Sequence, residues 1–296
     1  MKKSLESKKM CELLGLSFNI SIKPSISFTG FRSKGEQNPD GWGIAYYPVA
    51  NNKNKSEKSA QIIKEPINSK KSNLSSFLTD YQKLESKLII SHVRKSSKKN
   101  FGHKNTHPFS RELNGCEYIF AHNGTFNNNK DDFNKGRFIP MGVTDSENIF
   151  CHILGCIEEN GITQWDSGNG KENFEWLSNK LNEVNENGKL NCIFSDSEYL
   201  FCYQDNNGHH NNLYYLHRKP PYDKANLSDE ELKIKLDEEK YDDQTGYVVA
   251  TKRLTNEYWE SFEPGELIVF KDGEIIYSNK RDFDHPTETN KGILEY

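Results

Sequence analysis

Short apolar runs separated by polar turns dominate the hydrophobic pattern of this chain. The first run, CELLGLSFN over residues 11–19, favours a buried strand and places Cys11 at its start. Similar runs predict strands at 43–49, 60–64, 87–93, 117–122, 191–195, 199–203, 213–217, 247–251 and 266–270. Asp196 with Ser197, and Asp272 with Gly273, fit two-residue hairpin turns. The spacing of the runs therefore predicts antiparallel sheets.

Apolar residues at helical spacing predict fewer helices than strands. Thr144 followed by Glu147 is a capping-box pattern, and apolar residues at 149, 150, 153, 154 and 157 then share one helix face. A second helix is predicted at 174–185, a weaker one at 74–81 and a charged, solvent-facing one at 229–239. Many antiparallel strands with few amphipathic helices predict an α+β fold in one domain, with two sheets packed face to face and helices outside.

The composition excludes several classes of protein. The chain has 296 residues and a formal net charge of -4, so no basic field indicates nucleic acid or an anionic membrane as a partner. The first ten residues, MKKSLESKKM, lack an apolar core, and no later run reaches the roughly 18 apolar residues that span a membrane.

The 6 cysteines match neither a disulfide scaffold nor paired metal-ligand spacing, so we expect a cytoplasmic protein. The polar tract at 51–58 is expected to be a solvated loop.

Five short clusters carry residue types that packing alone rarely brings together. They are Cys11, DGWG at 40–43, HVR at 92–94, HNG at 122–124 and TDSE at 144–147. Taken singly, each also fits an ordinary structural role, such as a buried strand cysteine, an Asn-Gly turn or a first-turn aspartate beside a helix dipole. Together and in this order, with the motifs MCELLGLS, DGWG, NTHPF, AHNG and TDSE, the chain resembles the class II glutamine amidotransferases, in particular their stand-alone YafJ type. The resemblance runs from Cys11 to about Phe270.

The resemblance implies a fold and a set of roles. The fold is that of the N-terminal-nucleophile (Ntn) hydrolases, a four-layer αββα sandwich. Cys11 would be the nucleophile and its own free α-amine the base, because such an amine has an unperturbed pKa of roughly 7.7–8.0. The Asn123 side-chain amide and the Gly124 backbone N–H match the oxyanion hole. Arg94 would bind the α-carboxylate of a glutamyl group, and Asp145 would bind its α-ammonium.

Other motif residues are expected to shape the site. Gly41 and Trp42 resemble the loop beside the nucleophile and are expected to line the site. Three histidines are interpreted as residues that hold loops by hydrogen bonding: His92, His107 and His122. His103 and His107 are four residues apart, but the Asn105 and Pro108 near them indicate a loop, so no metal site is predicted. The implied reaction needs no cofactor.

The residues ahead of Cys11 set a condition, because an attached chain makes the proposed base an amide. We expect 1–10 to be a removed leader or propeptide, or Met10 to be the true start. The amidotransferase domain is expected at 11–280 and a tail at 281–296. About 25 residues follow Phe270, too few for an acceptor domain, so ammonia transfer would need a partner subunit.

Three functions remain open at this point. The first is hydrolysis of glutamine to glutamate and ammonia through a γ-glutamyl thioester on Cys11. The second applies the same chemistry to a γ-glutamyl peptide or conjugate such as glutathione, with Arg94 and Asp145 binding the same glutamyl group. The third is a non-catalytic γ-glutamyl-binding protein, which is favoured if Cys11 stays internal.

Overall fold

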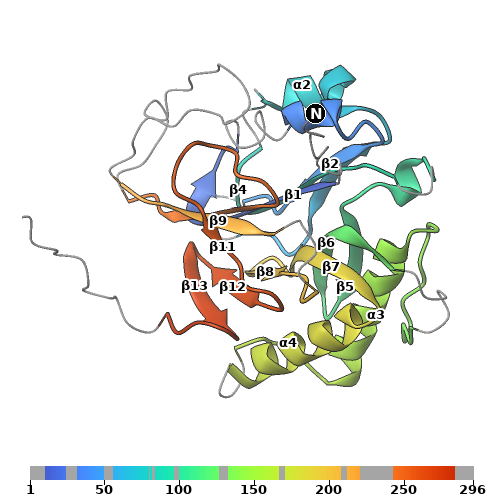
Figure 1. The fold of residues 1–296 in the computed structure, drawn as a ribbon, viewed down its shortest axis with the longest axis vertical. Coiled ribbons are helices and arrows are strands. Elements are labelled where there is room, and N and C mark those ends of the chain that lie inside the picture. Colours follow the sequence, from blue (N-terminus) through green and yellow to red (C-terminus); the bar gives the residue numbers. More distant parts are fainter. Residues whose placement is uncertain are drawn as a thin grey trace, which may run out of the picture.

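The computed structural model of the chain contains two antiparallel sheets that lie face to face (Figure 1). The residues that the structure describes are 11–24, 32–49, 56–79, 81, 84–96, 100–126, 133–166, 171–207, 212–220 and 243–283. The expected leader at 1–10, the helix expected at 229–239, most of the tract at 51–58 and the tail beyond residue 283 lie outside these residues.

The two sheets contain seven and six strands. Across the first sheet the order is β11 (Glu260–Ser261), β9 (Tyr214–Arg218), β10 (Gly246–Ala250), β1 (Glu12–Ile22), β4 (Ser86–Val93), β2 (Trp42–Tyr46) and β3 (Gln61–Glu65). Across the second it is β13 (Glu274–Ser278), β12 (Leu267–Lys271), β8 (Tyr199–Tyr203), β7 (Gly188–Ser195), β6 (Cys116–Phe126) and β5 (Phe109–Leu113). Within these described strands, neighbours pair antiparallel, as the sequence predicts.

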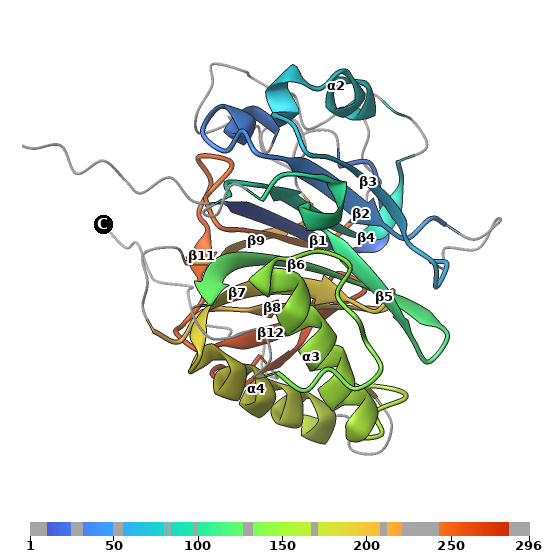
Figure 2. The same ribbon diagram turned by 90° about the vertical axis from the view of Figure 1, so that its right-hand side faces the viewer.

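Helices cover the outer faces of both sheets (Figure 2). α3 (Asp145–Glu159) and α4 (Lys171–Asn185) lie along the six-stranded sheet, and α2 (Asn73–Thr79) lies over the seven-stranded sheet. Short 3-10 turns are η1 (Lys34–Glu36), η2 (Ser69–Lys71) and η3 (His103–Asn105). The predicted αββα sandwich is confirmed. Among the described residues, no helix is long and apolar enough to cross a membrane.

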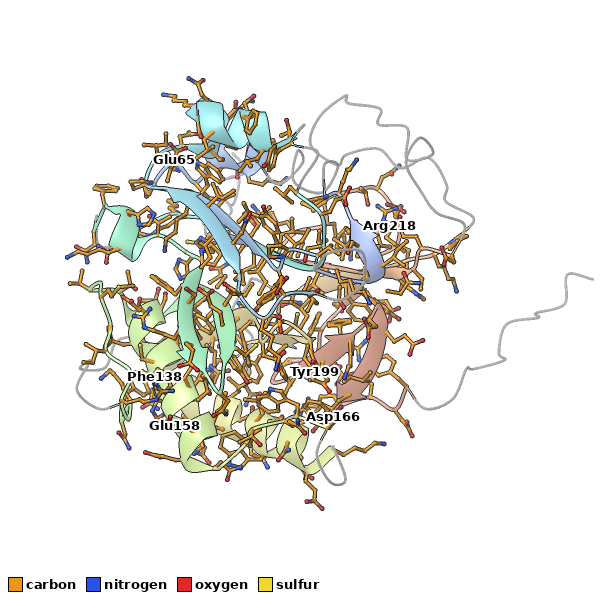
Figure 3. The ribbon with its side chains drawn as sticks, turned by 180° about the vertical axis from the view of Figure 1, so that it is seen from behind. Glu65, Phe138, Glu158, Asp166, Tyr199 and Arg218 are labelled. Atoms are coloured by element: carbon orange, nitrogen blue, oxygen red, sulfur yellow. The ribbon has the colours of Figure 1, made fainter. Side chains whose placement is uncertain are left out.

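Alternation along the strands distributes the apolar residues over three layers of core. In β1, Leu13 packs between the sheets and Leu14 packs on the outer face beneath α2. In β6, Ala121 packs between the sheets and Phe120 packs against the α3 and α4 layer. Side chains fill the space between the layers (Figure 3). Because a buried leucine or phenylalanine contributes roughly 1.5–3 kcal/mol, these layers fix which face of each strand points inward.

The predicted runs are found as strands, and the differences lie in polar segments. β5, β11 and β13 were not predicted, because β5 (FSREL) keeps only two apolar residues, β11 (ES) has none and β13 (EIIYS) has a run of only three. Asp272 and Gly273 form the predicted two-residue turn, with φ of 47° and 79°. The turn at Asp196 is longer than predicted and includes Glu198, because Asp196 Oδ1 accepts hydrogen bonds from the backbone N–H groups of Glu198 and Tyr199.

Candidate active site

Cys11, Gly41 and Arg94 flank the last residue pairs of β1, β2 and β4 at one end of the seven-stranded sheet. Arg94 N donates to Gly41 O at 2.7 Å, and Asp40 N donates to Arg94 O at 3.1 Å. Lys95 N, one residue further on, donates to Cys11 Sγ at 3.1 Å. Three hydrogen bonds from backbone N–H groups therefore hold three of the sequence clusters together at this end of the sheet.

Strand alternation turns Cys11 and Asn123 toward each other across the sandwich. Cys11 lies on the same face of the first sheet as Leu13, and Asn123 lies on the same face of the second sheet as Ala121. Both faces point into the space between the sheets. Asn123 Nδ2 donates to Cys11 O at 2.5 Å, which joins β6 of one sheet to the start of β1 in the other.

The Cys11 thiol is partly buried and hydrogen bonded to the backbone of Lys95. Sγ donates to Lys95 O at 3.2 Å as well as accepting from Lys95 N. Burial raises the pKa of the Cys11 thiol to about 11, against the smaller opposing effects of Lys95 and the Arg94 charge. The thiol is therefore protonated at neutral pH, and its reaction as a nucleophile requires a base.

Arg94 is a buried cation with hydrogen-bonding capacity to spare. The residue is 6% exposed, and among the described residues its Nη1 has no hydrogen-bond partner. Burial lowers the pKa of Arg94, while the nearby side chains of Cys11, Asp40 and Asp145 act in the opposite direction. Asp40 is itself held in place, since its Oδ2 accepts from Ser96 N at 2.7 Å. A free guanidinium edge of this kind suits a carboxylate ligand.

Asp145 starts α3 and is joined to the end of β6. Thr144 is the N-cap, and its Oγ1 accepts from Glu147 N at 3.2 Å. Asp145 Oδ2 accepts from Phe126 N, the last residue of β6, at 2.9 Å, and Oδ1 accepts from Ser146 N at 3.0 Å. A carboxylate has about four acceptor positions, so Asp145 keeps capacity for an ammonium ligand.

The capping box predicted at α3 is only half formed. The Glu147 carboxylate accepts from Met141 N at 2.9 Å, from Gly142 N at 2.6 Å and from Arg111 Nη2 at 2.5 Å. Glu147 is fully buried, so these three donors replace the water that its charge loses. The segment before α3 is thereby fixed to β5.

Gly41 immediately precedes β2, and Trp42 is the first residue of that strand. Gly41 has φ of +148°, and a Cβ there would lie 3.2 Å from Thr106 Cγ2. Trp42 is 1% exposed and packs in the outer cluster beneath α2. Its indole therefore points away from the face that carries Cys11, and Trp42 contributes to the site by anchoring the strand that follows Gly41.

His92 and His107 do not hold loops by hydrogen bonds, contrary to the sequence interpretation. Their ring centroids are 4.2 Å apart, and among the described residues no ring nitrogen of either makes a hydrogen bond of normal geometry, although the nearby backbone of His122 acts to raise the pKa of His92. Burial lowers the pKa of His92 to about 3 and that of His107 well below its usual range. Both are neutral packing residues. His122 differs, because both of its nitrogens are hydrogen bonded, to Ser146 and Lys189.

Sequence reasoning assigned no role to Lys64 or Ser146. Lys64 Nζ donates to Thr106 O at 2.7 Å and Pro108 O at 2.9 Å, and burial lowers its pKa to about 8. A lysine in a strand gives no sign of this in the sequence. Ser146 lies inside the TDSE motif, and its position next to Asp145 was the available signal. Among the described residues, no group of three metal-ligating side chains is found.

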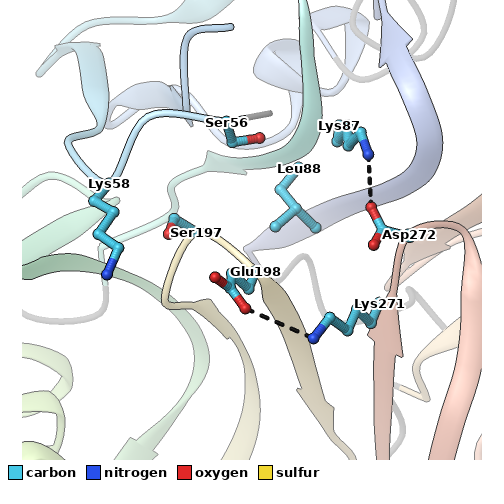
Figure 4. Close-up of a pocket in the computed structure, with 8 residues that line it drawn as sticks. All are labelled: Ser56, Lys58, Lys87, Leu88, Ser197, Glu198, Lys271 and Asp272. Carbon is cyan, nitrogen blue, oxygen red and sulfur yellow. Dashed lines mark hydrogen bonds and ion pairs between the residues drawn. The ribbon is translucent and has the colours of Figure 1, made fainter. Parts of the chain in front are cut away.

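A pocket with a volume of about 260 Å³ lies away from Cys11, and its lining residues are drawn in Figure 4. Its lining residues are Ser56, Lys58, Lys87, Leu88, Ser197, Glu198, Lys271 and Asp272. Leu88 pairs with Ser17, which lies six residues along β1 from Cys11, a separation of about 20 Å. Lys87 Nζ contacts Asp272 Oδ1 at 2.7 Å within it. This pocket is separate from the Cys11 end.

A known protein family matches nearly the whole chain. The family of class II glutamine amidotransferases matches residues 10–293. The chain is 43% identical over 272 residues to an uncharacterized protein of Methanocaldococcus jannaschii, covering 92% of this chain and 72% of the other. It is 32% identical over 271 residues to "Putative glutamine amidotransferase YafJ" of Escherichia coli, covering 90% and 100%.

Solved structures share the fold. A predicted glutamine amidotransferase from Pseudomonas aeruginosa superimposes with a TM-score of 0.60 at 24% identity, covering 90% of this chain and 96% of the other. Glutamine phosphoribosylpyrophosphate amidotransferase from B. subtilis gives a TM-score of 0.59 at 18% identity, covering 90% and 48%. At these identities the likeness concerns the fold alone.

Proposed function

The chain belongs to the class II glutamine amidotransferases, and on this premise we propose that it hydrolyses the side-chain amide of glutamine to glutamate and ammonia, with Cys11 as its N-terminal nucleophile. The observation that carries the proposal is the convergence of Cys11, Arg94, Asn123 and Asp145 at one end of the sandwich. These residues come from four separate segments of the sequence.

The α-amine of Cys11 supplies the missing base. Once Cys11 is the first residue, its amine takes the thiol proton, and Sγ attacks the side-chain carbonyl carbon of glutamine. The C–N bond then breaks, and the amine returns the proton to the leaving nitrogen, which departs as ammonia. Water hydrolyses the resulting γ-glutamyl thioester to glutamate and restores the thiol. No metal or cofactor takes part in this sequence.

The remaining site residues stabilise the oxyanion and bind the charged groups of the substrate. The Asn123 amide has two N–H groups, so one can bond Cys11 O while the other donates to the oxyanion beside the Gly124 N–H. Arg94 binds the α-carboxylate of the substrate and Asp145 binds its α-ammonium. Gly41 lies beside Arg94 and lines the carboxylate side, with Trp42 anchoring its strand.

Removal of residues 1–10, or initiation at Met10 followed by loss of that methionine, belongs to the proposal. With the upstream chain attached, the Cys11 nitrogen is an amide and cannot accept the thiol proton. The six free thiols suit a reducing, cytoplasmic compartment. If the ammonia is transferred rather than released, a partner subunit supplies the acceptor site.

Two alternatives keep the same site. A γ-glutamyl peptide or conjugate would present the same carboxylate and ammonium to Arg94 and Asp145 and differ only in its leaving amine. A non-catalytic γ-glutamyl-binding protein would result if Cys11 stays internal, because the thiol, with its pKa of about 11, has no base.

The test compares three proteins whose first residue is verified by intact mass: the chain from Met1, the chain from Cys11, and the latter with Cys11→Ala. Ammonia release from glutamine and amine release from γ-glutamyl peptides are measured in parallel. Turnover is expected only for the chain that begins with an intact Cys11. Cys156→Ala, which removes another partly buried thiol, is the matched control and should retain activity. Equal turnover by the Cys11→Ala protein would refute the proposed nucleophile.

A further inference from the structure

His122 forms two hydrogen bonds whose directions the structure defines. Its Nε2 lies 2.9 Å from Lys189 O on β7, and its Nδ1 lies 2.9 Å from Ser146 Oγ in the first turn of α3. A carbonyl oxygen only accepts, so Nε2 carries the proton. Burial lowers the pKa of His122, which keeps the ring neutral at neutral pH. Nδ1 therefore accepts a hydrogen bond from the Ser146 hydroxyl.

The same imidazole explains why residue 124 is glycine. A Cβ at Gly124 would lie 2.4 Å from His122 Nε2 and 1.9 Å from Lys189 O. The His122–Lys189 hydrogen bond thus occupies the space that any other side chain at 124 would need. Gly124 is a glycine because of this bond behind it, and not only because a substrate must approach from the other face.

Two links tie the start of α3 to the end of β6. Ser146 bonds to His122, and the preceding residue, Asp145, accepts from Phe126 N. The two links meet β6 on either side of the segment Asn123–Gly124. The hydrogen bonds His122–Ser146 and Phe126–Asp145 therefore form one frame, which connects the oxyanion donors to the ammonium acceptor of the proposed site.

We propose that His122 is a positioning residue that holds Asn123 and Gly124 at a fixed distance from Asp145. The inference rests on the proposed function, since it concerns the same site. His122 lies on the face of β6 that packs against α3, opposite the face that Asn123 presents to Cys11, so it acts without touching substrate. A glutamine bound through its ammonium must place its side-chain carbonyl at the oxyanion donors, and the length of this frame sets that match.

Ser146→Ala and three His122 variants test the proposal on chain that begins at Cys11. Ser146→Ala frees the helix start but keeps the Lys189 bond, so KM for glutamine should rise on the order of tenfold with kcat nearly unchanged. His122→Ala removes both bonds, and kcat should also fall by about 10²-fold. His122→Gln retains a donor for Lys189 O and should recover most of kcat but not KM. His122→Phe keeps the ring volume without either bond and should resemble His122→Ala.

Asn148→Ala is the matched control. Asn148 Nδ2 donates to Thr144 O at 2.8 Å in the same turn of α3, so its loss loosens that turn without breaking the His122 link. Its KM and kcat should stay within about twofold of wild type. If Ser146→Ala has the same KM as Asn148→Ala, or if every variant loses kcat only in proportion to its folded fraction, the positioning role is wrong.

Calorimetry of L-glutamate binding to the Cys11→Ala protein gives the same comparison without turnover. Weaker glutamate binding in the Ser146→Ala background supports the frame even if wild type proves inactive on glutamine, a result that would contradict the proposed function alone. Unchanged affinity in that background overturns the frame while leaving the proposed function standing. Absence of glutamate binding to Cys11→Ala protein that is otherwise folded overturns both.

Discussion

Replacing Gly124 by alanine should separate β6 from β7 at the candidate site. The new Cβ would lie 1.9 Å from Lys189 O, whereas ordinary contact begins near 3.4 Å, so the two strands must move apart locally by about 1.5 Å. Lys189 O belongs to the backbone, and no side-chain rotation relieves the contact. Overpacking costs about 1–3 kcal/mol and loss of the buried His122–Lys189 hydrogen bond about 1–3 kcal/mol. We expect the free energy of unfolding to fall by about 2–6 kcal/mol.

Urea unfolding followed by tryptophan fluorescence measures this loss. In the protein that remains folded, kcat for ammonia release from glutamine should fall by about 10²-fold, because the oxyanion donors are displaced. Gly115→Ala is the control: it has φ of +74° and open space around its Cα, so it should cost only the backbone strain of about 1–2 kcal/mol and leave kcat unchanged. A Gly124→Ala protein within roughly 0.5 kcal/mol of wild type would refute the reasoning.

Two further predictions concern stability. The pKa of His92 is about 3 in the native chain and roughly 6.5 in the unfolded chain. Between these two values only the unfolded chain binds a proton at His92. The free energy of unfolding therefore decreases as the pH falls from 6.5 toward 3. At pH 5.5 the effect of His92 alone should lower the free energy of unfolding by about 1.4 kcal/mol relative to pH 8, as measured by urea unfolding. A His92→Gln variant whose free energy of unfolding falls by as much as that of wild type over this pH range would contradict the prediction. Arg111→Met leaves the fully buried Glu147 without its cation, so it should lower the free energy of unfolding by about 3–5 kcal/mol in the same measurement. Arg111→Lys keeps a cation and should lower it by less. A cost below about 1 kcal/mol would show that the Met141 and Gly142 N–H groups suffice.

The fold was largely predictable because its strands alternate or are uniformly apolar. β8 was predicted with the limits that the structure gives, since YLFCY is apolar throughout and turns flank it. β5 was missed because FSREL keeps only two apolar residues, and its place beside β6 is decided by tertiary contacts such as Phe109 packing in the core below the second sheet.

The candidate site residues were predicted from motifs, whereas the hydrogen bonds that join these residues to the rest of the chain could not be predicted. No local pattern shows that Glu147 bonds to Arg111, 36 residues away, instead of closing the capping box. Likewise Trp42 shares a motif with Gly41, but alternation along β2 places the Trp42 side chain on the outer face of the sheet, away from Cys11.

The alternation that turns Cys11 inward limits how sequences of this kind can change length. β1 is paired on both sides, with β4 and β10, so its register is fixed from Leu14 to Ser17. A single insertion between Cys11 and Leu14 would rotate the cysteine to the face away from Asn123. A double insertion would restore the face but carry the thiol about 7 Å past the end of the strand. Related chains with an insertion or deletion in this short interval should therefore have lost the thiol chemistry while keeping the fold. The number of residues in the interval can be counted from sequence alone.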